Sequence, residues 1–162
     1  MRKYGVVLAL VVVSVAVWVA SASAISSPQV FDLLAVSGQP QPINGFTFDR
    51  FPRAGDQFGI ADTLYKWAGT KRGALAGHDQ GIGTFQSVGK NSQTALFTVT
   101  VYLSGGTMFI EGMAKTINGP SNLTLPILGG TGKYAGANGY VHVRALAGSG
   151  GNNSNLEFHL LR

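Results

Sequence analysis

The 162-residue chain contains no cysteine and only two glutamates. The absence of cysteine excludes disulfide staples, thiol nucleophiles and cysteine-ligated metal sites. Charged residues make up only 12% of the chain, and so few charged helix formers are available that long helices are hard to build. The 23 glycines, combined with short β-branched and aromatic runs, favour an all-β domain.

The first 24 residues have the order of a secretory signal peptide. Arg2 and Lys3 precede an uncharged apolar run over 5–20, and Ala22-Ser23-Ala24 fits a small-residue cleavage pattern. The run is shorter than the roughly 20 residues that a membrane-spanning helix needs. We therefore predict a secreted, extracellular protein, located in the apoplast or cell wall if the source is a plant, with no membrane span after removal of residues 1–24.

The rest of the chain has the size of one domain and a small basic surplus. Two of the twelve basic residues lie in the predicted signal, which leaves ten against seven acidic residues and a net charge of +3. The basic residues are scattered, so the sequence predicts no nucleic-acid partner. The surplus serves either solubility or attraction to an acidic surface such as a cell wall.

Alternating apolar and polar residues predict about eight strands. The clearest covers 94–103 and is followed by a hairpin signal, Ser104-Gly105-Gly106. Residues 25–37 form either a first strand or a flexible start. The other expected strands cover 46–51, 57–65, 78–87, 107–113, 123–128, 140–146 and 156–161, with a proline-containing loop over 38–44.

Strands of this number can close into an antiparallel eight-stranded β-barrel, which removes their edges. The interior of such a barrel is filled by side chains or holds one small ligand. We divide the chain into the signal (1–24), an N-terminal strand and loop region (25–54) and the barrel core (55–162).

Asp62 is the first candidate site residue. It shares a predicted strand face with Phe58, Ile60 and Leu64. A carboxylate on an apolar face is costly unless it is paired or lines a wet pocket, where its pKa rises and it can act as a general acid. The alternative is that this face meets solvent at a barrel end.

Four further side chains are candidates for a substrate pocket. Tyr102, Tyr140 and Arg144 can donate hydrogen bonds to a phenol, and His78 precedes an aspartate in the manner of half a hydrolase relay, although no serine elbow accompanies it. Each of the four can equally be an outward surface residue. The three histidines show no metal-ligand spacing, so no metal site is expected.

Two other patterns occur in the sequence. The glycine-rich segment 129–139 matches neither phosphate-binding pattern, because Tyr134 follows the lysine of the P-loop pattern and Ala135 replaces the third glycine of the dinucleotide pattern. Asn122 and Asn152 begin Asn-x-Ser/Thr sequons, which predict glycosylated surface loops if the host glycosylates.

At this point the sequence resembles a known family. Residues 129–140 (GGTGKYAGANGY) look like the GGTGKF-x-x-A-x-G-Y signature of dirigent domains, and 77–81 (GHDQG) is similar to their G-R-A-Q-G strand. Residues 59–65 (GIADTLY) stand where dirigent proteins carry an aspartate pair. The signature residues are Gly129, Gly130, Thr131, Gly132 and Lys133.

The resemblance implies a secreted barrel that binds phenoxy radicals and directs their stereoselective coupling. A separate oxidase in the same compartment would make the radicals, and no metal or redox cofactor is implied. Asp62 matches a pocket acid that assists proton transfer from a quinone methide. The second aspartate of the family pair is replaced by Ala61 or Thr63, and the family's usual cysteines are absent. Related barrels form homo-oligomers, so the resemblance is compatible with either a homodimer or a homotrimer.

The middle of the chain is also similar to allene oxide cyclase barrels, which share the eight-stranded fold. The similarity rests on Gly55-Asp56, Leu64-Tyr65, Lys71-Arg72 and Gly81-Ile82. The polar residues on which cyclases depend are replaced here, by Asp62 and Gly83 among others. The sequence thus leaves two alternatives, a cyclase-like isomerase and a non-catalytic ligand-binding or wall-associated barrel.

Overall fold

A computed structural model describes residues 28–38, 40–89, 92–116, 122–149 and 153–161. The predicted signal, 1–24, and the second sequon asparagine, Asn152, lie outside the described residues. The described part of the chain is nearly all strand. The strands are β1 (Gln29–Ser37), β2 (Gln41–Ile43), β3 (Gln57–Trp67), β4 (Arg72–Gly89), β5 (Ser92–Leu103), β6 (Gly106–Thr116), β7 (Leu123–Gly130), β8 (Asn138–Ala145) and β9 (Asn153–Leu161).

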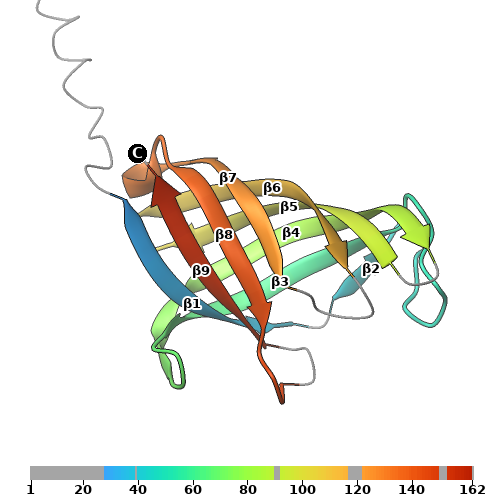
Figure 1. Ribbon diagram of the computed structural model, residues 1–162, viewed down its shortest axis with the longest axis horizontal. Coiled ribbons are helices and arrows are strands. Elements are labelled where there is room, and N and C mark those ends of the chain that lie inside the picture. Colours follow the sequence, from blue (N-terminus) through green and yellow to red (C-terminus); the bar gives the residue numbers. More distant parts are fainter. Residues whose placement is uncertain (1–27, 39, 90–91, 117–121, 150–152, 162) are drawn as a thin grey trace, which may run out of the picture.

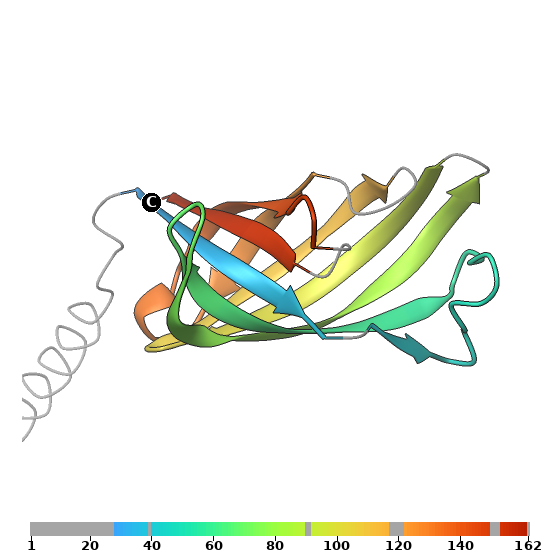
Figure 2. The same ribbon diagram turned by 90° about the horizontal axis from the view of Figure 1, so that it is seen from below.

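The strands form a closed antiparallel barrel, which confirms the predicted fold class (Figures 1 and 2). Their order is β1-β9-β8-β7-β6-β5-β4-β3-β2, and β1 also pairs with β3 to close the ring of eight. Along β3, residues 62–66 pair with β1 and residues 57–59 pair with the short β2. Closure therefore leaves β3 paired on both sides over most of its length.

The aromatic run 46–51 is not a strand, so this part of the sequence prediction was wrong. It belongs to a loop, 44–56, that starts with two left-handed residues, Asn44 and Gly45. Phe46 is buried in the fold, and the guanidinium of Arg50 forms a two-point ion pair with the carboxylate of Asp56, at 2.6 and 2.8 Å. The aromatic residues of this run thus serve to anchor a loop.

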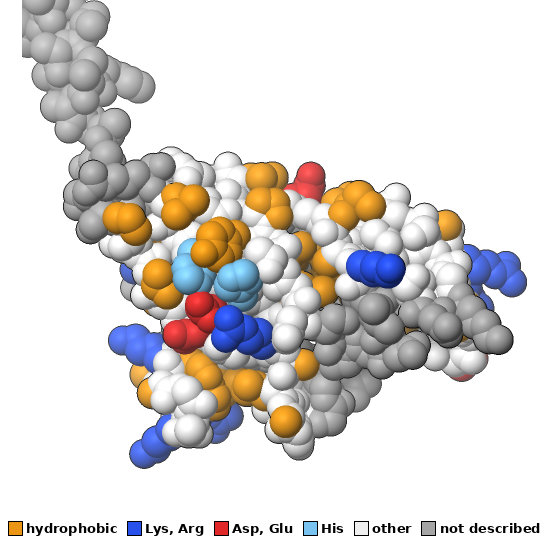
Figure 3. Space-filling model, in the orientation of Figure 1, with side chains coloured by type: hydrophobic (Ala, Val, Ile, Leu, Met, Phe, Trp, Pro, Cys, Tyr) orange, Lys and Arg blue, Asp and Glu red, His pale blue; other side chains and the backbone are white. Residues whose placement is uncertain are grey.

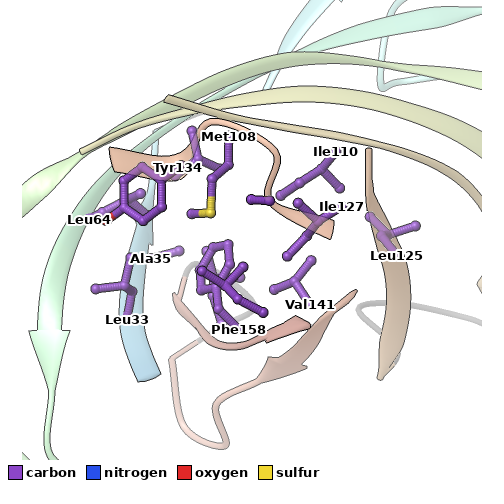
Figure 4. Packing of buried hydrophobic residues seen from close by; sticks show 14 of the residues in the cluster. Leu33, Ala35, Leu64, Met108, Ile110, Leu125, Ile127, Tyr134, Val141 and Phe158 are labelled. Carbon is purple, nitrogen blue, oxygen red and sulfur yellow. The ribbon is translucent and has the colours of Figure 1, made fainter. Parts of the chain in front are cut away.

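One half of the barrel is tightly packed. Leu64, Met108 and Phe158 have no exposed surface, and Figure 4 shows them with Tyr134 and aliphatic side chains from several strands. Tyr134 comes from a short 3-10 helix, η1 (Gly132–Tyr134), at the end of β7. We call this half the closed end, because the interior there is filled.

The Gly129–Lys133 motif builds that closed end. A Cβ on Gly130 would lie 2.5 Å from the carbonyl oxygen of Thr107, so only glycine fits between these two segments. The Thr131 hydroxyl lies 2.7 Å from that of Thr107 and accepts a hydrogen bond from the Thr107 N–H. The motif ties β7 and η1 to the start of β6, which is a structural role.

We expect Thr131→Ala to destabilise the fold by about 1 kcal/mol, because two hydrogen bonds of its hydroxyl are lost from an exposed site. Urea unfolding measures the change. Thr47→Ala, in the exposed part of the loop, is the control. Equal effects of the two substitutions would contradict the structural role of the motif.

No helix in the described residues has the length and apolar character required to cross a membrane.

Candidate functional site

Two aspartates lie side by side on the inner wall of the barrel. Asp62 on β3 pairs in register with Asp79 on β4. Asp62 has the same strand parity as Leu64, which belongs to the packed core, so its side chain faces inward. Asp79 pairs in turn with the buried Val101 of β5 and is itself only 5% exposed. The structure therefore settles the orientation that the sequence left open for Asp62.

The two residues are also linked by hydrogen bonds. The backbone N–H of Asp62 donates to Oδ1 of Asp79 at 3.1 Å. The hydroxyl of Ser37, the partner of Asp62 on β1, donates to the Asp62 carboxyl. We refer to Asp62 and Asp79 as the dyad. β3 and β4 carry its two members, and β1 supplies the Ser37 hydroxyl.

The environment favours the protonated form of both carboxyls. Burial raises the pKa of Asp62, and the Ser37 hydrogen bond opposes this effect. Burial and the nearby charge of Asp62 raise the pKa of Asp79 to about 7, against the opposing hydrogen bond from the Asp62 backbone. Because the two groups interact, the titration belongs to the pair. Near neutral pH the dyad can both hold and release a proton, as a general acid–base requires.

Glycines flank Asp79 on the inner face of β4. Positions 77, 81 and 83 share its parity, and all three are glycine. The close approach of β5 accounts for Gly81, where a Cβ would lie 2.4 Å from the carbonyl oxygen of Thr98. At Gly83 a Cβ would lie 2.2 Å from the Phe58 ring. Asp79 therefore has no neighbouring β4 side chain that blocks access to its carboxyl.

Aromatic rings line the interior beyond the dyad. Phe58 lies 5.4 Å from Phe85 and 6.2 Å from Phe97, measured between ring centroids. Phe46 and Phe48 of loop 44–56 extend this cluster to the barrel rim. Phe58, Phe85 and Phe97 are only half-buried although they face inward, unlike the core of the closed end. We call this the open end. The dyad lies at the boundary between the two halves.

The four predicted pocket residues lie elsewhere. Tyr102 alternates with the core residue Val101 and is stacked on His78, with centroids 4.7 Å apart. Both side chains are therefore on the outer surface. Tyr140 and Arg144 alternate with the inward Val141 and Val143, which places them outside as well. The structure brings none of the four to the dyad.

Tyr140 and Arg144 belong to an outer cluster on β8 and β9. The Tyr140 ring stacks on His159 with centroids 4.5 Å apart, and Arg144 forms a 3.0 Å ion pair with Glu157. His142 contacts the same rings. Figure 3 shows histidine, acidic and basic side chains gathered on this face of the barrel. The cluster consists of surface contacts between paired strands.

The first sequon lies at an exposed strand start. Asn122 is exposed, and the hydroxyl of Thr124 is hydrogen-bonded to Nδ1 of His142 at 2.8 Å. Its use as a glycosylation site stays a prediction.

Asp79 was missed as a site residue. The inner face of β4 consists here of Asp79 and the glycines at 77, 81 and 83. Because none of these residues is apolar, the sequence does not mark this face as the one that points inward. Hydrophobicity alone would have placed Ile82 inside, whereas it is 43% exposed. Pairing the predicted strands 57–65 and 78–87 as an antiparallel hairpin would have brought Asp79 close to Asp62, and the structure shows the two residues directly opposite each other.

The family model described as "Dirigent-like protein" matches residues 40–161, which is most of the chain. The chain belongs to the dirigent-like family. Among curated proteins, no sequence match is found.

Several solved structures share the fold of this dirigent-like chain. A pyocyanin demethylase is 23% identical with a TM-score of 0.63, covering 79% of this chain and 98% of the other. The Diels–Alderase AbmU from Streptomyces koyangensis is 14% identical with a TM-score of 0.64, covering 99% and 81%. A pterocarpan synthase dirigent protein is 20% identical with a TM-score of 0.58, covering 83% and 92%. At these identities the comparison shows a common barrel and leaves the chemistry of the site to its residues.

Proposed function

We propose that this dirigent-like protein binds phenolic radicals in the open end of its barrel and directs their stereoselective coupling. A separate oxidase in the same extracellular compartment would supply the radicals. The observation that carries the proposal is the dyad, which faces the same interior as the half-buried phenylalanine rings further along the barrel. No other pair of carboxyls among the described residues is buried in this way.

The aromatic wall would act by confinement. Phe58, Phe85 and Phe97 offer ring faces and edges against which planar phenols pack. Two radicals held in one relative orientation form their new carbon–carbon bond through one face only, and the fixed geometry replaces a random encounter. This step consumes the two unpaired electrons and needs no further oxidant.

The dyad would act on the quinone methide that coupling produces. Protonated Asp79 donates its proton to the quinone methide oxygen, which makes the exocyclic methide carbon, conjugated with that oxygen through the ring, electrophilic. A hydroxyl of the same molecule attacks that carbon, and its proton passes to a carboxylate of the dyad. One proton is given and one is recovered, so the dyad returns to its starting state.

A coupling assay tests the proposal. The purified protein is added to coniferyl alcohol with a one-electron oxidase, and the dimeric products are separated on a chiral column. We expect an enantiomeric excess that is absent when the protein is left out. Racemic dimers at every protein concentration would contradict directed coupling of this substrate.

A cyclase-like isomerase is the second candidate. It is supported by the combination of an apolar interior with a proton donor, which suits the opening of an epoxide. This function predicts conversion of a fatty-acid epoxide without any oxidase. If the ligand binds but no product changes in either assay, the third alternative, a ligand-binding or wall-associated barrel, is correct.

A further inference from the structure

The hairpin that joins β3 to β4 is basic and projects from the closed end. Lys66, Lys71 and Arg72 are all exposed, and residues 65–75 contain no acidic side chain. The short helix η1, which contains Lys133, lies at the same end of the barrel (the orange coil in Figure 1). Figure 3 shows Lys and Arg side chains at the end where this hairpin projects. Three cations are therefore concentrated on one short hairpin, and a fourth, Lys133, belongs to an element at the same end of the barrel.

These cations form no ion pair within the described residues, where the salt bridges involve Arg50, Arg144 and His159 instead. The acid on the neighbouring strand, Asp32, accepts a hydrogen bond from the amide of Asn155. Arg72 is held in place by the ring of Tyr65, with its guanidinium carbon 4.8 Å from the ring centroid. The hairpin thus presents exposed cations that form no ion pair in the described part of the chain.

We propose that this basic hairpin binds a polysaccharide that carries carboxylate groups. Each exposed cation contributes little to affinity by itself. A polymer that repeats its carboxylates can engage several cations in succession, so the weak contacts add through effective concentration. The contact is electrostatic and exposed, and it should therefore weaken with added salt.

The shape of the hairpin favours a polar polymer over a membrane. Peripheral proteins enter the lipid interface with apolar side chains such as Trp, Phe or Leu. Here the turn itself, residues 68–71, is Ala-Gly-Thr-Lys and offers no large apolar side chain for insertion, and the one strongly exposed leucine of the hairpin, Leu75, lies behind the turn on β4. The aromatic residues Tyr65 and Trp67 lie behind it on β3 and are half-buried.

The proposed surface is independent of the coupling site. It lies at the closed end, at and beyond the last residues of β3, whereas Asp62 of the dyad lies midway along β3. From Gln57 to Trp67, β3 runs roughly 30 Å between the two ends. A protein bound to a matrix through its hairpin would keep its open end free for ligand.

Two variants of equal charge test the proposal. Lys71→Gln/Arg72→Gln removes two cations from the hairpin, and Arg53→Gln/Lys115→Gln removes two exposed cations elsewhere. Binding of the full-length protein to immobilised polygalacturonate is measured at low ionic strength, with the methyl-esterified polymer as the neutral control. We expect the hairpin variant, which loses two contacts at once, to bind roughly tenfold more weakly, and the other variant to lose less than about twofold.

Three results would overturn the proposal. Equal losses in both variants would show that only net charge matters. Wild-type binding that is the same for the esterified polymer would exclude recognition of carboxylates. Binding to vesicles containing anionic phospholipid, without binding to polygalacturonate, would identify a membrane as the partner. The coupling assay, run on the same hairpin variant, should give unchanged products, so the two proposals fail separately.

Discussion

Asp79→Asn is expected to lower the yield of stereoselective product about 100-fold, the effect of losing a general acid–base. Asparagine keeps the size of the side chain but cannot donate a proton from a carboxyl group. The substitution removes the dyad member whose pKa is raised to about 7 and leaves the aromatic wall intact. Binding of the phenol, measured by fluorescence or calorimetry, should therefore change little while the chirally resolved product falls.

Asp49→Asn is the matched control, because Asp49 is an exposed carboxyl in loop 44–56. It should leave the yield and the enantiomeric excess unchanged. Asp62→Asn removes the neighbouring charge that helps to raise the pKa of Asp79 and should move the pH optimum of the reaction downward. Full activity of Asp79→Asn would contradict a catalytic dyad, and the barrel would then act by confinement alone.

The second large effect is a loss of stability as the pH rises. In the unfolded chain Asp79 releases its proton near pH 3.8, but in the folded chain only near pH 7. Between these values the folded state binds the extra proton, so raising the pH favours unfolding. Over the whole interval from pH 3.8 to about pH 7, this effect lowers the free energy of unfolding by roughly 4 kcal/mol. Between pH 5 and pH 8 we expect the free energy of unfolding to fall by about 2–3 kcal/mol.

The measurement is urea unfolding at the two pH values. Other groups also titrate in this range, and the variant Asp79→Asn corrects for them because it removes only Asp79 and its coupling to Asp62. The variant should lose less stability than the wild type over the same interval, and at pH 8 it should be the more stable of the two. Parallel pH profiles for the two proteins would show that Asp79 titrates normally.

The sequence predicted the barrel well because its strands alternate strongly. In 94–103 every second residue is apolar, and those residues do face the interior. The same rule placed Asp62 on the face of Leu64, where the structure finds it. The glycine signature at 129–133 also identified the family that the family model confirms.

The candidate pocket was harder to predict, because the sequence prediction assumed that side chains able to donate hydrogen bonds to a phenol face the ligand. Tyr140 and Arg144 were therefore considered as pocket residues, although the valines between them are the ones that face inward. The barrel instead places its interior polar groups on β3 and β4, with Ser37 of β1 beside them. Alternation tells which residues share a face, and it identifies the inner face only where that face is the apolar one.

Long-range contacts explain the misassigned loop. Phe46 and Phe48 have the composition of a strand, and local propensity favours one. The Phe46 ring instead packs on Phe85, which is distant in sequence, and the Phe48 ring packs on Phe58 at the start of β3. Two left-handed residues and the Arg50–Asp56 ion pair then fix the chain in a loop. Tertiary packing here outweighs local preference.

The most direct test of the dyad is a titration of its carboxyl carbons by ¹³C NMR. We predict that one aspartate carboxyl titrates near pH 7 and that its signal is missing in Asp79→Asn. Its neighbour, Asp62, should respond to the same step because the two groups are coupled. If every aspartate instead titrates near its ordinary pKa, the interior does not hold a proton at neutral pH, and the proposed proton transfer is contradicted.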